Sequence, residues 1–231
     1  MSSAALLPML DREKPVKMQI YMWLRDNIIK GAMCPGALVD KTRLAAELGV
    51  SPTPLREALI LLKHDGFIEM IPNLHTIVAL IDIRLVHANA LIRYSLEASI
   101  VEQIASNGLS LQTENACLHL IDEQERHLID GNYEAVFECD LAFHKTLCDV
   151  LELPTLWLNL SANRAHLDRA RQCSPVNLAG IRKAINDHRE IIALLKKQDV
   201  LALRKLMKNH VYSVFDDLDQ IKPDWLINNR A

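Results

Sequence analysis

The chain contains 231 residues, and 50% of them are hydrophobic, so it can bury the core of one large domain or of two smaller ones. Its formal net charge of −3 gives no indication of a nucleic-acid partner, so such a function must be argued from a motif. Aromatic residues make up only 5% of the chain and glycine occurs 7 times, while leucine, isoleucine and alanine are abundant, which favours helices over sheets.

The sequence predicts a cytoplasmic protein without a membrane segment. No apolar run approaches the roughly 20 residues of a membrane-spanning helix. The N-terminal stretch MSSAALLPMLDREK lacks the early basic region and the long apolar core of a signal peptide. The five cysteines form no CxxC pair, which is typical of reduced thiols in the cytoplasm.

After a loose tail over residues 1–14, the chain predicts a helix, a short helix, a tight turn, a third helix and a hairpin. The predicted elements are helices over 16–30, 41–48 and 52–65 and a small hairpin over 67–80. A glycine follows each helix, at Gly31, Gly49 and Gly66, where glycine commonly ends helices. Ser51 stands where it can cap the third helix.

This order of elements is typical of a winged helix-turn-helix, in which the third helix enters the major groove by its N-terminal end. That end carries Ser51, Thr53 and Arg56. Arginine can bind O6 and N7 of guanine with two hydrogen bonds, and a hydroxyl can reach a phosphate or a base edge. The alternative is a small helical domain in which Arg56 is merely solvated. The candidate phosphate contacts are Lys41, Arg43 and Lys63.

Residues 18 to about 80 closely resemble the DNA-binding domain of the GntR family of bacterial transcription regulators. The matching positions are Leu24, Ile28, Gly31, Pro35-Gly36, Leu44-Ala45, Leu48-Gly49-Val50-Ser51, Thr53-Pro54, Arg56-Glu57-Ala58, Leu62 and Gly66. The resemblance implies a homodimer that binds a double-stranded DNA operator. Pro52 departs from the arginine usual in the family, and Leu74 and His75 stand where the wing often has a basic residue and glycine. His75 is the wing's candidate DNA contact, and the operator is expected to differ from those of relatives.

From Asp82 onward the sequence predicts about six helices and no further strand. The segments are roughly 82–107, 111–130, 133–151, 154–172, 178–197 and 200–220. Short breaks between long helices predict an antiparallel bundle. The expected fold class is mainly α, an N-terminal winged helix-turn-helix plus a C-terminal antiparallel all-α bundle. The expected domains are a tail over 1–14, a DNA-binding domain over 15–80, a helical domain over 81–222 and a tail over 223–231.

Four polar residues fall at the centres of apolar stripes on three of these helices, where an unpaired polar group is costly to bury. They are Asp140, His144, His188 and His210. Imidazole and carboxylate are common ligands of zinc. A single histidine in such a place is more often bonded to a backbone carbonyl, but four polar groups would each need a partner. One divalent metal ion would satisfy all four, and zinc, nickel and manganese all remain open.

Residues 82–220 resemble the ligand-binding domain of the FadR-like subgroup of GntR regulators. The similar stretches are RYSLE from Arg93, DLAFH from Asp140, DHREIIALL around His188 and LMKNH ending at His210. In many members of this subgroup an aspartate and three histidines bind a metal in the core of the bundle, and metal-bearing members commonly sense small organic acids. The resemblance therefore implies these four metal ligands and a small organic acid effector.

Arg93 is the main candidate for binding the effector. If its side chain points inward, the guanidinium can clamp a carboxylate with two hydrogen bonds. The alternative is an i,i+4 pair with Glu97 on the surface or at a helix contact. Asn163 and Arg164 are weaker candidates for the effector pocket. The predicted function is thus a ligand-responsive, DNA-binding regulator, with a metal-dependent enzyme and a repressor with a purely structural metal site as alternatives.

Overall fold

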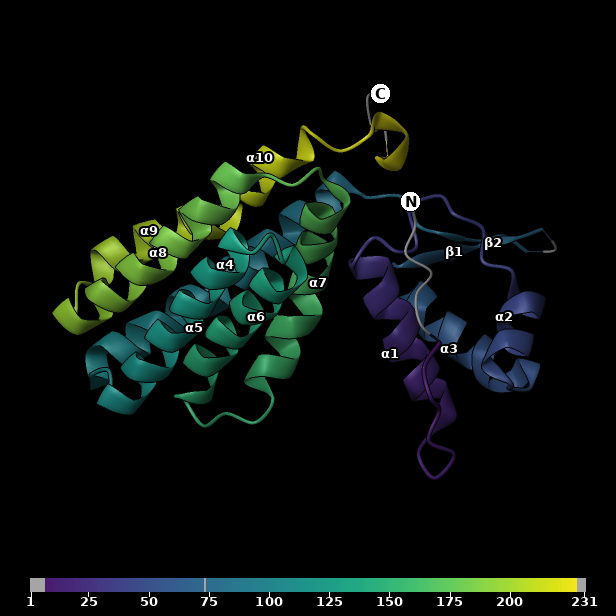
Figure 1. Ribbon diagram of the computed structural model, residues 1–231, viewed down its shortest axis with the longest axis horizontal. Coiled ribbons are helices and arrows are strands. Elements are labelled where there is room, and N and C mark those ends of the chain that lie inside the picture. Colours follow the sequence, from purple (N-terminus) through teal and green to yellow (C-terminus); the bar gives the residue numbers. More distant parts are fainter. Residues whose placement is uncertain (1–6, 73, 228–231) are drawn as a thin grey trace. The chain divides into compact units, whose positions relative to one another are not determined.

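The structure is a computed structural model that describes residues 7–72 and 74–227 (Figure 1). The outer parts of the two predicted tails, residues 1–6 and 228–231, lie outside the described residues. The N-terminal unit holds the described residues of Met1–Val86, His166–Pro175 and Leu218–Ala231, and the helical unit holds His87–Ala165 and Val176–Asp217. Within the described residues, no helix combines the length and apolarity needed to cross a bilayer.

The N-terminal unit contains the predicted winged helix-turn-helix. Its elements are α1 Val16–Ile29, α2 Lys41–Leu48, α3 Pro52–His64, β1 Ile68–Met70 and β2 Thr76–Val78. Apolar side chains recur one turn apart on α1 and α3, so the two helices pack together and bury Ile20, Leu24 and Leu59 almost completely. The strands β1 and β2 pair antiparallel, with Ile68 opposite Val78.

The turn between α2 and α3 sets where the third helix begins. Asp40 caps α2 by accepting hydrogen bonds from the backbone N–H groups of Thr42 and Arg43. Gly49 ends α2 with a φ of 62°, a left-handed conformation that glycine adopts without strain. Ser51 occupies the N-cap position of α3, but its hydroxyl makes no capping hydrogen bond to any described residue. Prolines in the first turn, whose rings fix a helical φ, start the helix instead.

Two later segments of the chain also belong to the N-terminal unit. The N–H of Ile81 donates to the carbonyl of Trp225 at 2.8 Å, and the N–H of Ile227 donates to the carbonyl of Ile81 at 3.0 Å. Residues 223–227, which the sequence assigned to a tail, therefore pair with the segment that follows the wing. The predicted domain limits stay a prediction.

The predicted helices after residue 82 are present, and they confirm the mainly α fold class (Figure 1). They are α4 Ile83–Asn107, α5 Leu111–Ile129, α6 Tyr133–Asp149, α7 Leu156–Cys173, α8 Leu178–Lys197, α9 Val200–Tyr212 and α10 Val214–Leu218. Four of them begin where a capping oxygen accepts a backbone N–H of the first turn, at Ser110, Asn132, Asn177 and Asp199. Within this region α5 packs against α6 and α8, and α8 packs against α9.

The last predicted helix is divided, which the sequence did not indicate. The segment expected over 200–220 breaks after Tyr212 and continues as α10. At the break the hydroxyl of Ser213 donates to the carbonyl of His210 at 2.7 Å.

Candidate metal centre and DNA-contact surface

Four buried side chains of the helical unit lie around one point. Asp140 and His144 come from α6, His188 from α8 and His210 from α9, and we call them the metal-ligand cluster. One ligand atom from each lies within 4.8 Å of the others. Nε2 of His210 is 3.3 Å from Nε2 of His144, and Nε2 of His188 is 3.4 Å from Oδ1 of Asp140. Bonds of about 2.0–2.2 Å place the ligands of one metal about 3–4 Å apart, so the cluster has the dimensions of a metal site.

Each histidine of the cluster is also held on its outer side. The contacts are His144 Nδ1 to Glu97 Oε1 at 3.2 Å, His188 Nδ1 to Gln124 Oε1 at 2.9 Å and His210 Nδ1 to Asp187 Oδ2 at 3.4 Å. A neutral imidazole has one N–H and one lone pair, so an acceptor at Nδ1 leaves the lone pair on Nε2. Metal-ligating histidines are commonly oriented in this way.

The sequence did not indicate Glu97, Gln124 or Asp187 as partners of the histidines, although a signal for Gln124 was present. Gln124 lies on the buried stripe of α5 with Cys117, Ile121 and Leu128. It is therefore a polar residue at a stripe centre, like the metal-ligand cluster. Asp187 directly precedes His188, and no periodicity marks it as a partner of a histidine on another helix.

Two arginines reach the cluster from neighbouring helices. Arg93 on α4 is fully buried, and its Nε donates to Oε1 of Glu97 at 3.0 Å while its Nη2 lies 3.1 Å from Nε2 of His144. Both interpretations of Arg93 thus describe part of its environment, because it points inward and also pairs with Glu97. Arg164 on α7 donates to Oδ2 of Asp140 at 2.6 Å. Its neighbour Asn163 is half-buried and donates its amide to the carbonyl of Asn159 on its own helix.

The electrostatics around Asp140, His144 and His188 favour the protonation states that a metal requires. Burial lowers the pKa of His188 to about 3 and moves the pKa of His144 well below its usual value. Burial alone would raise the pKa of Asp140, but the charge of Arg164 holds it well below the usual range. At neutral pH these imidazoles are uncharged and the carboxylate is ionised, as metal ligands must be.

The predicted DNA contacts all lie on the surface of the N-terminal unit. The exposed side chains are Lys41, Arg43, Ser51, Thr53, Arg56, Lys63 and His75. Thr53 and Arg56 lie in the first turns of α3, the end that a helix-turn-helix presents to the major groove. Arg43 donates to Glu47 on α2 at 2.7 Å, and a phosphate would have to compete with this exposed pair. Contact of these residues with DNA stays a prediction.

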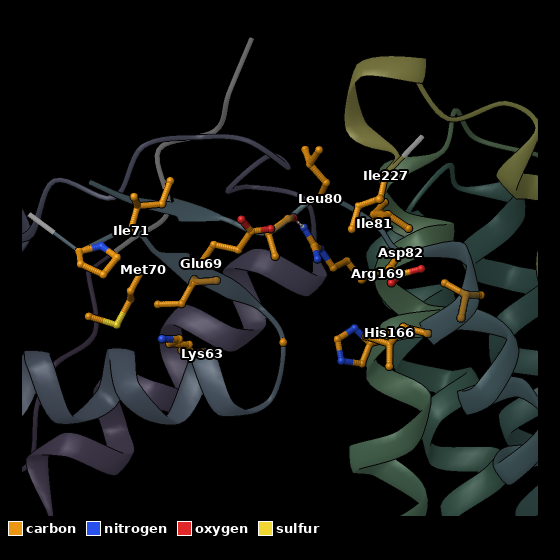
Figure 2. A pocket seen from close by; sticks show the side chains of 16 residues that line it. Lys63, Glu69, Met70, Ile71, Leu80, Ile81, Asp82, His166, Arg169 and Ile227 are labelled. Carbon is orange, nitrogen blue, oxygen red and sulfur yellow. Dashed lines mark hydrogen bonds between the residues drawn. The ribbon is translucent and has the colours of Figure 1, made fainter. Parts of the chain in front are cut away.

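A cavity of about 500 Å³ lies beside the wing of the N-terminal unit (Figure 2). Its polar lining includes Lys63, Glu69, Asp82, His166 and Arg169. The buried Arg169 donates from Nη2 to the carbonyl of Ala79, and the ring of His166 stacks on Phe67 with centroids 4.5 Å apart. Burial lowers the pKa of His166 to about 4, so this ring is neutral at pH 7. These two polar side chains thus anchor the backbone and the core around β1 and β2.

A winged helix-turn-helix followed by a helical domain with a buried polar cluster defines the class of protein as a DNA-binding transcription regulator. Residues 17–78 match the family described as bacterial regulatory proteins, gntR family, and residues 90–213 match the FCD domain. The chain therefore belongs to the GntR family of bacterial regulators, in the group that carries an FCD domain. The resemblance found in the sequence is confirmed.

Similar proteins of known sequence are also regulators. The chain is 29% identical over 203 residues to an uncharacterized HTH-type transcriptional regulator in an unstable DNA locus of Streptomyces ambofaciens, covering 88% of this chain and 85% of that protein. It is 28% identical over 222 residues to the HTH-type transcriptional repressor RspR of Escherichia coli K12, covering 94% and 96%. The relatives are transcription regulators, and this protein is a regulator rather than an enzyme.

Solved structures show the same fold. The structure of E. coli McbR/YncC has a TM-score of 0.70 at 23% identity, over 87% of this chain and 97% of that chain. A GntR transcriptional regulator from Rhodococcus sp. RHA1 has a TM-score of 0.73 at 19% identity, over 89% and 99%. These likenesses confirm the predicted combination of a winged helix-turn-helix with a helical domain.

Proposed function

We propose that this regulator binds operator DNA as a homodimer in the cytoplasm, and that a small organic acid bound at a divalent metal ion changes its operator affinity. The observation that carries the proposal is the geometry of the metal-ligand cluster. Its four ligand atoms lie within 4.8 Å of one another, and each imidazole is held by its outer nitrogen. Such an arrangement orients ligands before a metal arrives.

The donor set suits a divalent transition metal. Three imidazole nitrogens and one carboxylate oxygen are ligands that zinc and nickel accept, and manganese favours the carboxylate. Nε2 of His188 is buried without a hydrogen-bond partner among the described residues. Leaving such an atom unsatisfied costs about 1–3 kcal/mol, and a metal ion would remove that cost. A bound metal would also supply a positive centre for the effector.

The charges around the cluster favour an anionic effector. Three ion pairs border it: Arg93–Glu97, Arg164–Asp140 and Lys183–Asp187. Because each pair sums to zero, a divalent ion would add two uncompensated positive charges to a buried site, which is unfavourable. A small acid with one or two carboxylates would offset them. Arg93 is suited to bind such a carboxylate because its Nη1 is buried without a hydrogen-bond partner among the described residues.

Helix α4 could couple effector binding to DNA binding. It begins at Ile83, shortly after the wing strand β2, and carries Arg93 and Glu97 further along. A ligand that moves α4 would move the helix to which the wing is joined. A homodimer must fit two half-sites about 34–36 Å apart. A small change in the spacing of its two DNA-binding domains is therefore enough to weaken operator binding. By linkage, bound DNA must lower the affinity of the protein for the ligand by the same factor.

The test combines a ligand screen with DNA binding. Small organic acids are titrated calorimetrically into zinc-loaded protein, chelator-treated protein and Arg93→Ala, with the exposed Arg126→Ala as the matched control. We expect hits that bind zinc-loaded wild type and Arg126→Ala but lose affinity in the other two. Hits should also shift the binding curve of a DNA duplex selected by the protein from a random pool.

Two outcomes would contradict the proposal in different ways. Hits that bind all four samples equally would place the effector site elsewhere. Hits that need zinc but leave DNA affinity unchanged would support a ligand site at the metal and would contradict the coupling through α4.

A further inference from the structure

Two buried arginines contact the metal-ligand cluster, one at a carboxylate oxygen and the other at a ring nitrogen. Nη2 of Arg164 donates to Oδ2 of Asp140 at 2.6 Å. The other oxygen of that carboxylate, Oδ1, is the one near His144 and His188, so the Arg164 contact is compatible with a metal on Oδ1. Arg93 differs, because its Nη2 lies 3.1 Å from Nε2 of His144, the nitrogen that faces the centre.

The neighbours of His144 determine which of its nitrogens carries the lone pair. A guanidinium can only donate hydrogen bonds, and an ionised carboxylate can only accept them. Nδ1 of His144 lies 3.2 Å from Oε1 of Glu97 and therefore carries the proton, while Nε2 accepts a hydrogen bond from Arg93. A metal bond to Nε2 would use the same lone pair. The metal bond and the Arg93 hydrogen bond therefore exclude each other.

Arg93 has a second hydrogen-bonding arrangement within reach. Its Nε already donates to Oε1 of Glu97 at 3.0 Å. Nη1 of Arg93 and Oε2 of Glu97 are both buried without a hydrogen-bond partner among the described residues. Turning away from His144 would let the guanidinium bond to both oxygens of Glu97, or to a carboxylate brought by a ligand.

The cavity beside His144 is very small. The cavity lined by Glu97, His144, Cys148 and Met207, among others, has a volume of about 10 Å³. That volume is at the limit for a single water molecule. Arg93 and the cluster members other than His144 do not line this cavity, so it adds no room for a ligand at the centre of the metal-ligand cluster.

We propose that Arg93 competes with the metal ion for Nε2 of His144 and thereby couples metal binding to anion binding. This inference rests on the proposed function. The metal displaces the guanidinium, and a carboxylate that binds both the metal and the displaced guanidinium stabilises that arrangement. Metal and carboxylate consequently bind with positive cooperativity, each raising the affinity of the other by the same factor. Arg93 sets the size of this factor.

Zinc titrations of the full-length protein test the competition, with succinate as the probe carboxylate. Zinc affinity is measured by competition with a chromogenic chelator, with and without succinate. In Arg93→Met the Kd for zinc should fall about 10-fold, because the competing hydrogen bond from a charged donor is lost. Succinate should tighten zinc binding by about 10-fold in the wild type and by less than about 2-fold in Arg93→Met.

Arg164→Met is the matched control. It also removes a buried arginine beside the cluster, but one that bonds to Oδ2 of Asp140 and leaves the ligand nitrogens alone. It should not tighten zinc binding. Equal gains in Arg93→Met and Arg164→Met would show a general effect of removing positive charge, and would overturn the competition at His144.

Arg93→Lys keeps the inference testable if Arg93→Met loses its helical circular dichroism. Lysine retains a positive charge that can pair with Glu97, but its side chain ends short of the position of Nη2. It should tighten zinc binding as well. If the wild type binds zinc but neither Arg93 variant binds it more tightly, the proposed competition is wrong. The proposed metal centre is not affected by that outcome. Wild type that binds no zinc would overturn both proposals.

Discussion

The two units of the molecule place their candidate functional residues in opposite environments. In the N-terminal unit the predicted DNA contacts are exposed, and Arg56 lies on a helix whose other face buries Leu55 and Leu59. In the helical unit the metal-ligand cluster is itself part of the buried core. Surface substitutions usually change stability by less than about 0.5 kcal/mol, whereas removing one member of a buried charged pair is costly. Function and stability should therefore be separable in the first unit and inseparable in the second.

The largest expected effect is on the buried ion pair of the helical unit. Arg164→Ala leaves the carboxylate of Asp140 buried without the guanidinium that holds it at 2.6 Å. The free energy of unfolding should fall by about 3–5 kcal/mol, measured by urea denaturation in the presence of chelator. The control is Arg56→Ala, which should stay within about 0.5 kcal/mol of wild type. A stable Arg164→Ala would mean that the cluster tolerates an unpaired charge.

The next effect concerns the metal. At a free zinc concentration 100 times the Kd, zinc should stabilise the wild type by about 2.7 kcal/mol, seen as a higher melting temperature than in chelator. His188→Ala removes a ligand nitrogen and should abolish this gain. His119→Ala changes an exposed histidine on α5 and should retain it. A zinc-dependent shift that persists in His188→Ala would exclude this nitrogen as a ligand.

Substitutions on the exposed face of α3 should change DNA binding without changing stability. Arg56→Ala should weaken binding to a selected operator by about 1–3 kcal/mol if the side chain pairs with guanine, while the unfolding curve stays unchanged. Lys63→Ala should act more uniformly on operator and unrelated duplexes and should reduce the salt dependence of binding. Fluorescence anisotropy at several salt concentrations measures both. Operator affinity that is unaffected by Arg56→Ala would remove the central base contact.

The smallest expected effect is a pH dependence of the stability of the N-terminal unit. Burial lowers the pKa of His166 to about 4 in the folded protein, below the value of about 6.5 expected after unfolding. Between these values the unfolded chain binds the extra proton, so stability is complete above pH 6.5 and falls as the pH drops toward 4. At pH 5 the loss should be about 1–2 kcal/mol. Urea denaturation of chelated protein at pH 7 and pH 5 measures it, and His166→Gln should lose this part of the dependence.

The sequence could predict features whose cause is local. Glycines, capping side chains and the spacing of apolar residues mark the helix ends, and Asp140 and His144 stand out because polar residues interrupt an apolar stripe. The same periodicity cannot tell which of two neighbours turns inward, and so it predicts Asn163 and Arg164 alike as weaker candidates for the effector pocket. Arg164 reaches Asp140, whereas Asn163 bonds within its own helix. That outcome depends on how α7 packs.

Pairing between distant segments of the chain could not be predicted from the sequence. The bonds of Ile81 with Trp225 and Ile227 join segments that lie far apart in the sequence. Nothing in the composition of either segment indicates its partner, because backbone groups of any residue can make these bonds. The C-terminal segment therefore resembled a tail until the structure showed what it pairs with.

Anomalous X-ray scattering can show whether the metal-ligand cluster holds a metal ion. Crystals of protein purified without chelator are measured at the absorption edges of zinc, nickel and manganese. We expect one strong peak about 2.0–2.2 Å from Nε2 of His144, His188 and His210 and from Oδ1 of Asp140, with Arg93 turned away from His144. A map without a peak at this position, with the Arg93 hydrogen bond to His144 intact in protein soaked with each metal, would contradict this expectation.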